Sequence, residues 1–597
     1  MQTRWRLVAS FALVAGLPAA RPVSAQATAE TPSSAAPATE PNAPQPQRTE
    51  TSASQSRTPD SVRVRRKARS VQSGFESRRR QMLPRFYTGS AERCLIIGRL
   101  CYWDSRTSTD LVPAEGDAIR RARAQLLREL ETASRVLPGD DWITGQQIRY
   151  LIEARDTAAI RAATRDCSAT RWWCDALAGY TLHVRGGFAA ADTAFARALE
   201  AMPRETRCEW IDISRLLESD FRKEYERLSC DERQALAERI WWFADPLLMT
   251  PGNERRTEHF SRVVYTALQK DAANTFGMRW GDDLTEMVVR FGWSEKWTRR
   301  PESLTSDTRP AVTGHDASPG FHFLVKRRPP ESVDLVADSL WDLERTPPQE
   351  LYAPYYARSF AQLDAQVARF RRGDSTVVIA AYDVGEDTLL RNRKFSAALT
   401  VVGDVMSGAD TREISEAPLT QVMQITTASP SRLVGLELLA ADSAGAVRWR
   451  SGFRDLSLNP GRLIVSDLLF VDGGPALPGD LADAVSRAHA GTVFSRSAKV
   501  ALFWELYGKA PADTALPVSL TISPLGAGFL RSAMRALRLA PKATPLSVRW
   551  QENGSSGVLS ARSVLLDMSL VPPGRYEVKL EVGASNPAST STVIRIR

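Results

Sequence analysis

Apolar residues in the first half of the chain recur at steps of three and four, the spacing of helices that bury one face. The clearest run starts near Glu115 and stops at Pro138-Gly139, a pair that ends helices. Its apolar positions are Ile119, Ala122, Leu126, Leu130, Ala133 and Leu137. The same period continues to about Thr298. We therefore expect an α-helical region across this part of the chain.

Beyond residue 364 the pattern changes to short β-rich runs separated by Gly, Asp, Ser or Pro, as in antiparallel sheets. Strands are expected at 366–371, 375–382, 395–402, 419–425, 432–441, 446–450, 500–507, 517–522, 546–551, 563–569 and 575–582. A short helix is expected at Leu481–His489, and Asn553-Gly554 is a turn signal. The predicted fold class is multidomain α + β. Its N-terminal helical region precedes two antiparallel, Ig-like β-sandwich domains, one at 331–475 with a helical lead-in and one at 476–597.

Five residues of the helical part fall at the offsets of the small, aromatic and terminating positions of a tetratricopeptide repeat. They are Gly179, Ala191, Phe195, Ala198 and Pro203. Small residues let two antiparallel helices approach closely, and a proline ends the second helix. The segment therefore resembles one such repeat, and residues 89–240 are expected to form a TPR-like helical domain. Such arrays commonly bind peptides on a concave face, but they also serve as packing scaffolds. The sequence leaves both roles open.

The first 25 residues have the layout of a secretory signal peptide. Arg4 and Arg6 precede an apolar stretch, Leu7–Ala20, and the small residues Val23-Ser24-Ala25 follow it. Cleavage after Ala25 would place the protein in the periplasm or outside the cell, and no cysteine lies there for lipid attachment. No later apolar run reaches the about 20 residues that a transmembrane helix needs, so we expect no transmembrane span.

Residues 26–88 are predicted to be a disordered linker, because their Pro-, Ser- and Thr-rich part has almost no apolar side chains to bury. The linker ends in a basic tract: residues 57–87 carry ten basic and two acidic side chains, most of the formal net charge of +9. The rest of the chain is close to neutral, which excludes a basic nucleic-acid-binding domain. The tract is expected to be a solvated tether. The alternative is peripheral contact with an anionic envelope surface.

All six cysteines lie in the first half of the chain, and an even number suits an exported protein with disulfides. Pairing of sequence neighbours predicts three bonds: Cys94–Cys101, Cys167–Cys174 and Cys208–Cys230. None of the five histidines lies at a ligand-type spacing from two cysteines. We therefore expect neither a metal nor a cofactor.

The stretch 241–292 and two segments near the C-terminus carry a family resemblance. The first contains WWFADP at 241–246, NE at 253–254, EHF at 258–260, RWGDD at 279–283 and RFG at 290–292; FWELY at 503–507 and LDMSL at 566–570 follow. Residues 240–597 thereby resemble the bacterial GWxTD-domain family, exported proteins of uncharacterised activity. The naming motif falls on 279–283, where only Trp280 and Asp283 match. The resemblance implies a mixed segment at 241–330 and a family-motif cluster of Trp242, Asp245, Asn253, Glu254, Glu258, Arg262, Trp280, Asp283 and Arg290.

Two kinds of function fit these features. The acidic and aromatic residues between 241 and 292 can form a buried charge network, or a carboxylate site for acid–base or glycoside chemistry. The nucleophile elbow, the phosphate loop, the dinucleotide turn and the zinc helix have no match in the sequence, and we predict no catalytic residues. We expect an exported, non-enzymatic scaffold that binds envelope proteins or peptides through its helical repeats and β-sandwich loops. The alternative is an envelope enzyme or carbohydrate-binding protein that uses residues 241–292.

Overall fold

A computed structural model describes most of the chain after residue 58. The described residues are 59–86, 95–102, 112–299, 312–315, 320–331, 341, 343, 349–404, 406–428, 432–453, 456, 463–508, 515–525, 545–553, 559–584 and 587–597. The predicted signal peptide, the Pro- and Ser-rich part of the linker, Cys94 and Gly554 lie outside them. Within the described ranges, no helix is both long and apolar enough to span a membrane.

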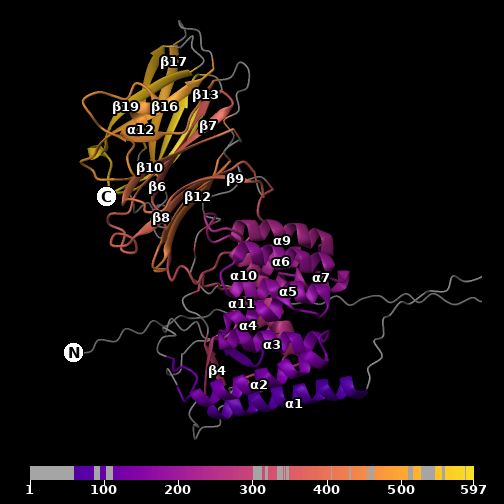
Figure 1. Cartoon of the computed structure of the whole chain (residues 1–597). Helices are drawn as coiled ribbons and strands as arrows, with labels where there is room; N and C mark the ends of the chain where they lie inside the picture. Colours follow the sequence, from indigo (N-terminus) through magenta and orange to yellow (C-terminus); the bar gives the residue numbers. More distant parts are fainter. Residues whose placement is uncertain are drawn as a thin grey trace, which may run out of the picture. The chain divides into compact units, whose positions relative to one another are not determined.

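The N-terminal part is helical, as predicted, and the sheets follow it along the chain (Figure 1). The helices are α1 (Pro59–Met82), α2 (Asp117–Val136), α3 (Asp141–Ala154), α4 (Thr157–Arg165), α5 (Arg171–Val184), α6 (Phe188–Ala201), α7 (Arg204–Trp210), α8 (Ser219–Tyr225), α9 (Cys230–Ala244), α10 (Glu254–Lys270) and α11 (Asp282–Phe291). In α2, the predicted apolar positions Ile119, Leu126, Leu130 and Ala133 are buried. Periodicity alone therefore identified the core face of this helix.

The basic tract is not a tether. It forms α1, which packs beside α2 (Figure 1). Its inner face buries Ala68 and Phe75, and the buried Glu76 accepts hydrogen bonds from Tyr150 (2.6 Å) and Arg149 (2.9 Å) of α3. Arg79 is also buried and donates to Glu153 of α3 (2.9 Å). The prediction failed because it counted charges along the sequence, whereas one side of this helix finds apolar and ionic partners far along the chain.

Helices α5 and α6 pack closely against each other. A Cβ added at Gly179 of α5 would lie 2.7 Å from the Phe195 ring of α6, so only glycine allows this approach. The face that α3, α5 and α6 share is covered by α10, whose Phe260, Val264 and Leu268 join their apolar core. Helix α10 therefore covers this face of the helical region.

Two of the predicted disulfides are present. Cys167–Cys174 closes the turn before α5, and Cys208–Cys230 joins α7 to the start of α9, with Cα–Cα distances of 5.9 and 5.6 Å. The third predicted pair, Cys94–Cys101, lies outside the residues whose side chains are described. The two bonds fasten neighbouring helices in a region whose helices are short.

The strands form several sheets, mostly antiparallel. The first large sheet has the order β5-β12-β11-β8-β9, formed by β5 (Phe360–Gln362), β8 (Phe395–Val402), β9 (Ala409–Ile414), β11 (Leu433–Ala440) and β12 (Ala446–Gly452). A three-stranded sheet, β10-β7-β6, faces it and comprises β6 (Ala365–Arg372), β7 (Ser375–Asp383) and β10 (Thr420–Thr427). These two sheets share one apolar core.

The second half of the β region also has two sheets around one core. In the first, β16 (Lys499–Tyr507) pairs with β13 (Ile464–Val465), β14 (Leu469–Asp472) and β19 (Leu559–Asp567). The second has the order β15-β21-β20-β17-β18, from β15 (Val493–Phe494), β17 (Ala515–Pro524), β18 (Leu546–Asn553), β20 (Gly574–Val582) and β21 (Ala588–Ile596). Trp504 of β16, fully buried, belongs to the core between them.

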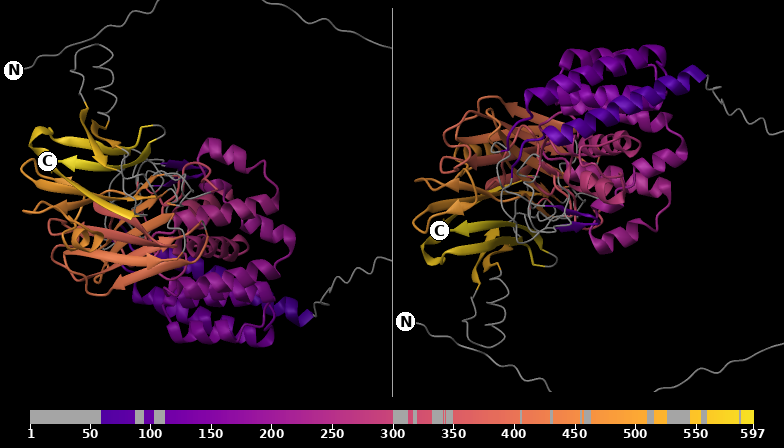
Figure 2. Two further views of the ribbon diagram at one scale, coloured as in Figure 1. Left: turned by 90° about the horizontal axis from the view of Figure 1, so that it is seen from above. Right: turned by 90° about the horizontal axis from the view of Figure 1, so that it is seen from below.

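The two halves are joined by a third core. The outer face of the β10-β7-β6 sheet packs through Phe370 and Ile379 against Leu469 and Phe503 of the β14–β16 sheet, together with α12 (Leu481–Ser486). Four sheets are thus stacked in sequence, and the stack is visible in Figure 2. The structure pairs residues 464–472 with β16, although the sequence placed them in the first half.

Every predicted strand range contains a strand, whereas β9, β21 and the short strands β5, β13, β14 and β15 were missed. Strand β9 (ADTREI) lies at a sheet edge and is exposed on both faces, so it has no alternation of apolar and polar residues to detect. Two small hairpins complete the list: β1 (Leu95–Ile97) with β2 (Leu100–Tyr102), and β3 (Lys296–Arg299) with β4 (Val312–His315).

Replacing Gly179 by Ala tests the close approach of α5 and α6. Alanine favours helices over glycine by about 1 kcal/mol, yet we expect Gly179→Ala to lower the free energy of unfolding by about 1–3 kcal/mol, because the new methyl group overlaps Phe195. Gly74 of α1 is the control, since a Cβ there meets no atom within 4 Å. Gly74→Ala should stabilise. Chemical denaturation distinguishes the two, and stabilisation by both substitutions would contradict the packing.

Candidate functional site

The family-motif cluster centres on α10, which is buried on almost every side. Asn253 caps its first turn: the side-chain oxygen accepts from the Arg256 backbone N–H (2.9 Å), and the amide donates to the Trp241 carbonyl of α9 (2.6 Å). Asn253 therefore fixes both the start of α10 and its position on α9. Trp242 is half-buried at the edge of the apolar core that contains Trp241, and its ring lies against Phe243.

Glu258 and Arg262 lie one turn apart on α10 and form a buried ion pair. Arg262 donates through Nε to Glu258 Oε1 (2.6 Å), and the other carboxylate oxygen lies 2.7 Å from Nε2 of His183 of α5. Burial alone would raise the pKa of Glu258, but Arg262 and His183 outweigh it and lower that pKa to about 2. Glu258 is thus a carboxylate with both oxygens engaged.

The remaining Arg262 donors hold backbone carbonyls. They reach the oxygens of Val289 (3.0 Å) and Arg290 (2.9 Å) at the C-terminal end of α11, and that of Leu351 (2.7 Å). A cation at these oxygens satisfies helix-end carbonyls and favours the helix dipole. Arg290 does similar work, since it donates to the Gln349 carbonyl (2.7 Å) and to Glu286 (2.8 Å). Arg262 thus fastens α11 and the segment around residue 350 to α10, and Arg290 fastens that segment to α11.

A second buried ion pair joins α10 to Glu350. Arg255 donates to Glu350 (2.7 Å), and Nδ1 of His322 lies 2.9 Å from the other oxygen of Glu350. Burial alone would raise the pKa of Glu350, but Arg255 and His322 outweigh burial and hold that pKa below its usual value. His315, the last residue of β4, does not join this site, because its ring bonds to the Thr298 hydroxyl (2.8 Å). Over the described ranges, no group of three or more His, Cys, Asp or Glu side chains is placed to hold a metal.

Asp245 and Glu254 are different, because burial raises the pKa of both carboxyl groups. The pKa of Glu254 is raised to about 8 by burial, although the Tyr356 hydroxyl donates to its Oε1. The pKa of Asp245 is raised by burial first and then by Glu254. Among the described residues, Oε2 of Glu254 and Oδ1 of Asp245 have no hydrogen-bond partner. Burial therefore favours the protonated, uncharged form of Glu254.

These two carboxyl groups lie where the helical region meets the first large sheet. Arg450 of β12 donates to the Asp245 carbonyl (2.7 Å), and its neighbour Arg448 donates to the Pro246 carbonyl (2.6 Å). Glu437 of β11 accepts from Arg450 and from the Met249 backbone N–H (2.9 Å). The loop between α9 and α10 is thereby tied to β11 and β12.

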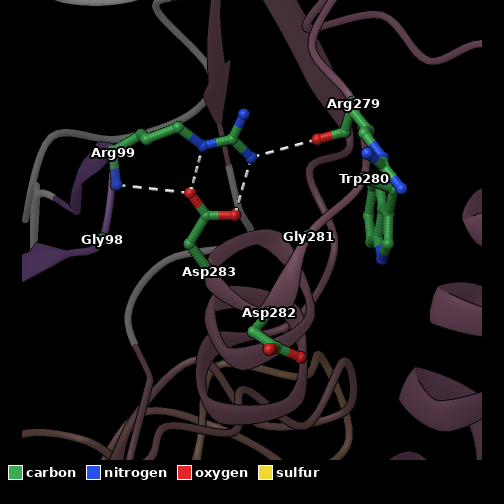
Figure 3. Close-up of a pocket in the computed structure, with 7 residues that line it drawn as sticks. All are labelled: Gly98, Arg99, Arg279, Trp280, Gly281, Asp282 and Asp283. Atoms are coloured by element: carbon green, nitrogen blue, oxygen red, sulfur yellow. Dashed lines mark hydrogen bonds and ion pairs between the residues drawn. The ribbon is translucent and has the colours of Figure 1, made fainter.

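The positions of the naming motif lie apart from this buried network, around a depression of about 510 Å³ lined by residues 98–99 and 279–283 (Figure 3). Figure 3 shows the Asp283 carboxylate turned toward Arg99 of the β1–β2 turn, which donates to its two oxygens at 2.6 and 2.8 Å. The hydrogen bond to Arg99 lowers the pKa of Asp283 to about 2. Trp280 donates to the Thr285 hydroxyl (3.0 Å), and the Asp282 side chain is exposed.

The nine predicted cluster residues therefore separate into three groups. Glu258, Arg262 and Arg290 meet around α10 and α11; Asp245, Asn253, Glu254 and Trp242 lie at the α9–α10 connection; Trp280 and Asp283 lie at the start of α11. Sequence reasoning missed their partners His183, Arg99, Tyr356 and Arg450, and it missed the buried pair of Arg255 with Glu350. These partners lie far along the chain from the residues they bind, and no local spacing marks them.

Replacing Glu258 by Gln tests the buried ion pair. The variant leaves Arg262 and His183 without their carboxylate, so at pH 7 we expect a loss of about 3–5 kcal/mol in the free energy of unfolding. The folded-state pKa lies below the ordinary 4.5. The stabilisation is therefore complete above pH 4.5 and lost as the pH falls toward 2 in the natural protein, and Glu258→Gln should lack this acid-dependent part. The control is Glu286→Gln, which removes a partly exposed partner of Arg290 and should cost under about 1 kcal/mol. Equal losses in both variants would contradict the assignment.

Replacing Glu254 by Gln should have the opposite pH dependence. The folded-state pKa of about 8 lies above the ordinary 4.5, so the natural protein loses stability as the pH rises from about 4.5 to 8, at up to about 1.4 kcal/mol per pH unit. Glutamine resembles the protonated acid and does not titrate. Glu254→Gln should therefore flatten the decline between pH 5 and 8, as measured by denaturation at several pH values. An unchanged slope would show that another group carries it.

No family model matches the chain, and the comparison with curated proteins finds no match. Among solved structures, the chain aligns with a calcium-binding mutant of Bacteroides uniformis beta-glucuronidase 2, at 11% sequence identity and a TM-score of 0.12. The alignment covers 44% of this chain and 30% of that chain, so the chain spans less than a third of the length of that protein. A TM-score at this level does not indicate a shared fold.

Proposed function

We propose that the protein is an exported, non-enzymatic scaffold of the bacterial cell envelope, with the architecture of a GWxTD-domain protein. The observation that carries this proposal is how the motif residues are used. Glu258, Arg262 and Arg290 are buried, and each is bonded to a charged partner or to a backbone carbonyl inside the fold. A catalytic carboxylate needs an oxygen that reaches a substrate. In this cluster the charged groups instead hold helices and loops in one arrangement.

The β region supports the proposed binding of envelope proteins or peptides. Two pairs of facing, mostly antiparallel sheets, each pair around its own core, are what tandem Ig-like sandwiches would contain. In such modules the loops at the ends of the sheets vary while the sheets persist, so the loops are the natural docking elements. We assign the binding of envelope proteins or peptides to these loops.

The helical region has a different part in the proposal. The tight α5–α6 pair around Gly179 supports a TPR-like unit. Because α10 covers the face shared by α3, α5 and α6, this unit serves as the packing scaffold for the motif segment rather than as an open peptide groove. Of the two roles that the sequence left open for a helical array, the scaffold is the one we propose.

Export rests on two observations. The disulfides Cys167–Cys174 and Cys208–Cys230 suit an oxidising compartment. The first 25 residues have the layout of a signal peptide. We therefore place the protein in the periplasm or outside the cell.

Site-specific crosslinking in producing cells tests the scaffold. A photo-reactive amino acid replaces Leu570 or Leu477 in the β region, and Val136 or Val184 in the helical region; all four side chains are exposed. We expect the β positions to capture a small, reproducible set of envelope proteins, identified by mass spectrometry, and the helical positions to capture far less. Absence of any captured protein at all four positions would contradict the scaffold.

The carbohydrate-binding or enzymatic alternative is tested at Asp283, the motif acid that lines the open depression. On our proposal, the natural protein neither binds nor hydrolyses glycans. Asp283→Asn should therefore change only the melting temperature, because the pair with Arg99 is lost. Binding or hydrolysis of envelope glycans by the natural protein, lost in this variant at unchanged melting, would favour the alternative.

A further inference from the structure

We propose that the outer faces of α1 and α2 form a basic surface that binds an anionic phospholipid bilayer. This inference does not depend on the scaffold function. It starts from the finding that the basic tract is a helix, because a helix divides its charges into those that face the protein and those that face outward. Figure 1 shows α1 and α2 side by side, and the α1 side of this pair is seen in the right view of Figure 2.

Three of the eight cations of α1 are used inside the protein. Arg79 is buried among Glu76, Glu115 and Glu153, and Arg65 pairs with Asp140 at the start of α3. Arg80 donates to the Asn274 carbonyl (2.9 Å). These residues have structural partners and do not add to the outer charge. The basic tract therefore places less positive charge on the outer surface than its sequence suggests.

The outer carboxylates of the two helices are also neutralised. Each pairs with a cation of the same surface: Asp60 with Arg63, Asp117 with Arg120, Glu129 with Lys67 and Glu131 with Arg135. Such exposed pairs are individually weak, but they cancel charge on this surface. The side chains that remain unpaired determine the sign of the charge on this surface.

Five exposed arginines remain without an acidic partner among the described residues. Three are on α1 (Arg66, Arg69 and Arg78), and two are on α2 (Arg121 and Arg128), seven residues apart and so on one side of the helix. Arg69 lies over the ring of Trp142, 5.3 Å from its centre. We call Arg66, Arg69, Arg78, Arg121 and Arg128 the arginine surface.

The layout of the arginine surface favours a lipid bilayer over a discrete ligand. At 1.5 Å per residue, Arg66 and Arg78 are about 18 Å apart along α1, and they do not converge on one point. A small anion needs converging donors, whereas the phosphates of a bilayer can move laterally to meet dispersed charges. Guanidinium groups pair well with phosphates. The exposed large apolar side chains of this pair of helices are only Val62 and Val136, so attraction is electrostatic and decreases with salt.

Vesicle sedimentation tests the proposal. Mature full-length protein is mixed with phosphatidylcholine vesicles that contain or lack phosphatidylglycerol, at 0.05 and 0.5 M salt. Each arginine near an anionic surface is worth about a five-fold change in affinity. We therefore expect the quadruple change Arg66→Gln, Arg78→Gln, Arg121→Gln and Arg128→Gln to reduce binding to anionic vesicles by at least tenfold at low salt. Raising the salt from 0.05 to 0.5 M should also reduce binding of the natural protein to anionic vesicles.

Two variants separate charge at this surface from charge in general. The control changes four exposed arginines of the β region to Gln, Arg391, Arg549, Arg575 and Arg595, and should keep affinity within about threefold. A second variant with Lys at the four arginine-surface positions keeps the charge and should keep most of the binding. Unchanged binding by the quadruple Gln variant, an equal loss in the control, or equal binding to vesicles without phosphatidylglycerol would overturn the proposal. Binding to immobilised polyglutamate as tight as to anionic vesicles would overturn the assignment to lipid.

Discussion

Arg262 is the residue on which the arrangement of the helical region depends. Its guanidinium group bonds at once to Glu258 on its own helix, to the last carbonyls of α11 and to the backbone of Leu351. A buried cation without its partners is strongly unfavourable, so these elements must come together if Arg262 is to be buried at all. Arg255 repeats the same logic with Glu350. Helix α10 thus carries charges inside the core and uses them to hold three other segments.

The same device joins the helices to the sheets. Arg448 and Arg450 of β12 donate to carbonyls in the loop after α9, and Glu437 of β11 balances their charge and holds the Met249 N–H. Apolar residues from both regions surround this junction in one continuous core. Directional bonds to backbone groups fix the loop more closely than apolar contact alone, because apolar contact is not directional. Glu254 lies beside these groups, and burial raises its pKa so that the uncharged form is favoured.

Stacking of four sheets explains an unusual feature of the β region. Strands β7 and β16 are buried along almost their whole length, on both faces. An antiparallel sheet with one solvated face alternates apolar and polar residues, whereas a sheet covered on both sides needs an apolar residue at nearly every position. The runs VVIAAY and VALFW are therefore inner-layer sequences. The core that contains Phe370 and Phe503 joins the two halves of the β region into one stack.

The sequence by itself determined what depends on neighbours a few residues apart. The periods of α2 and of most strands, the approach of Gly179 to Phe195 and the pairing of Cys167 with Cys174 all follow from local spacing. Tertiary structure alone decided the partners: Glu258 with His183, Asp283 with Arg99 and the loop at Asp245 with Arg450. It also decided that the basic tract folds into α1 and that α10 covers the face shared by α3, α5 and α6. These contacts join residues far apart along the chain, and a charge or a carbonyl shows in sequence neither its partner nor its burial.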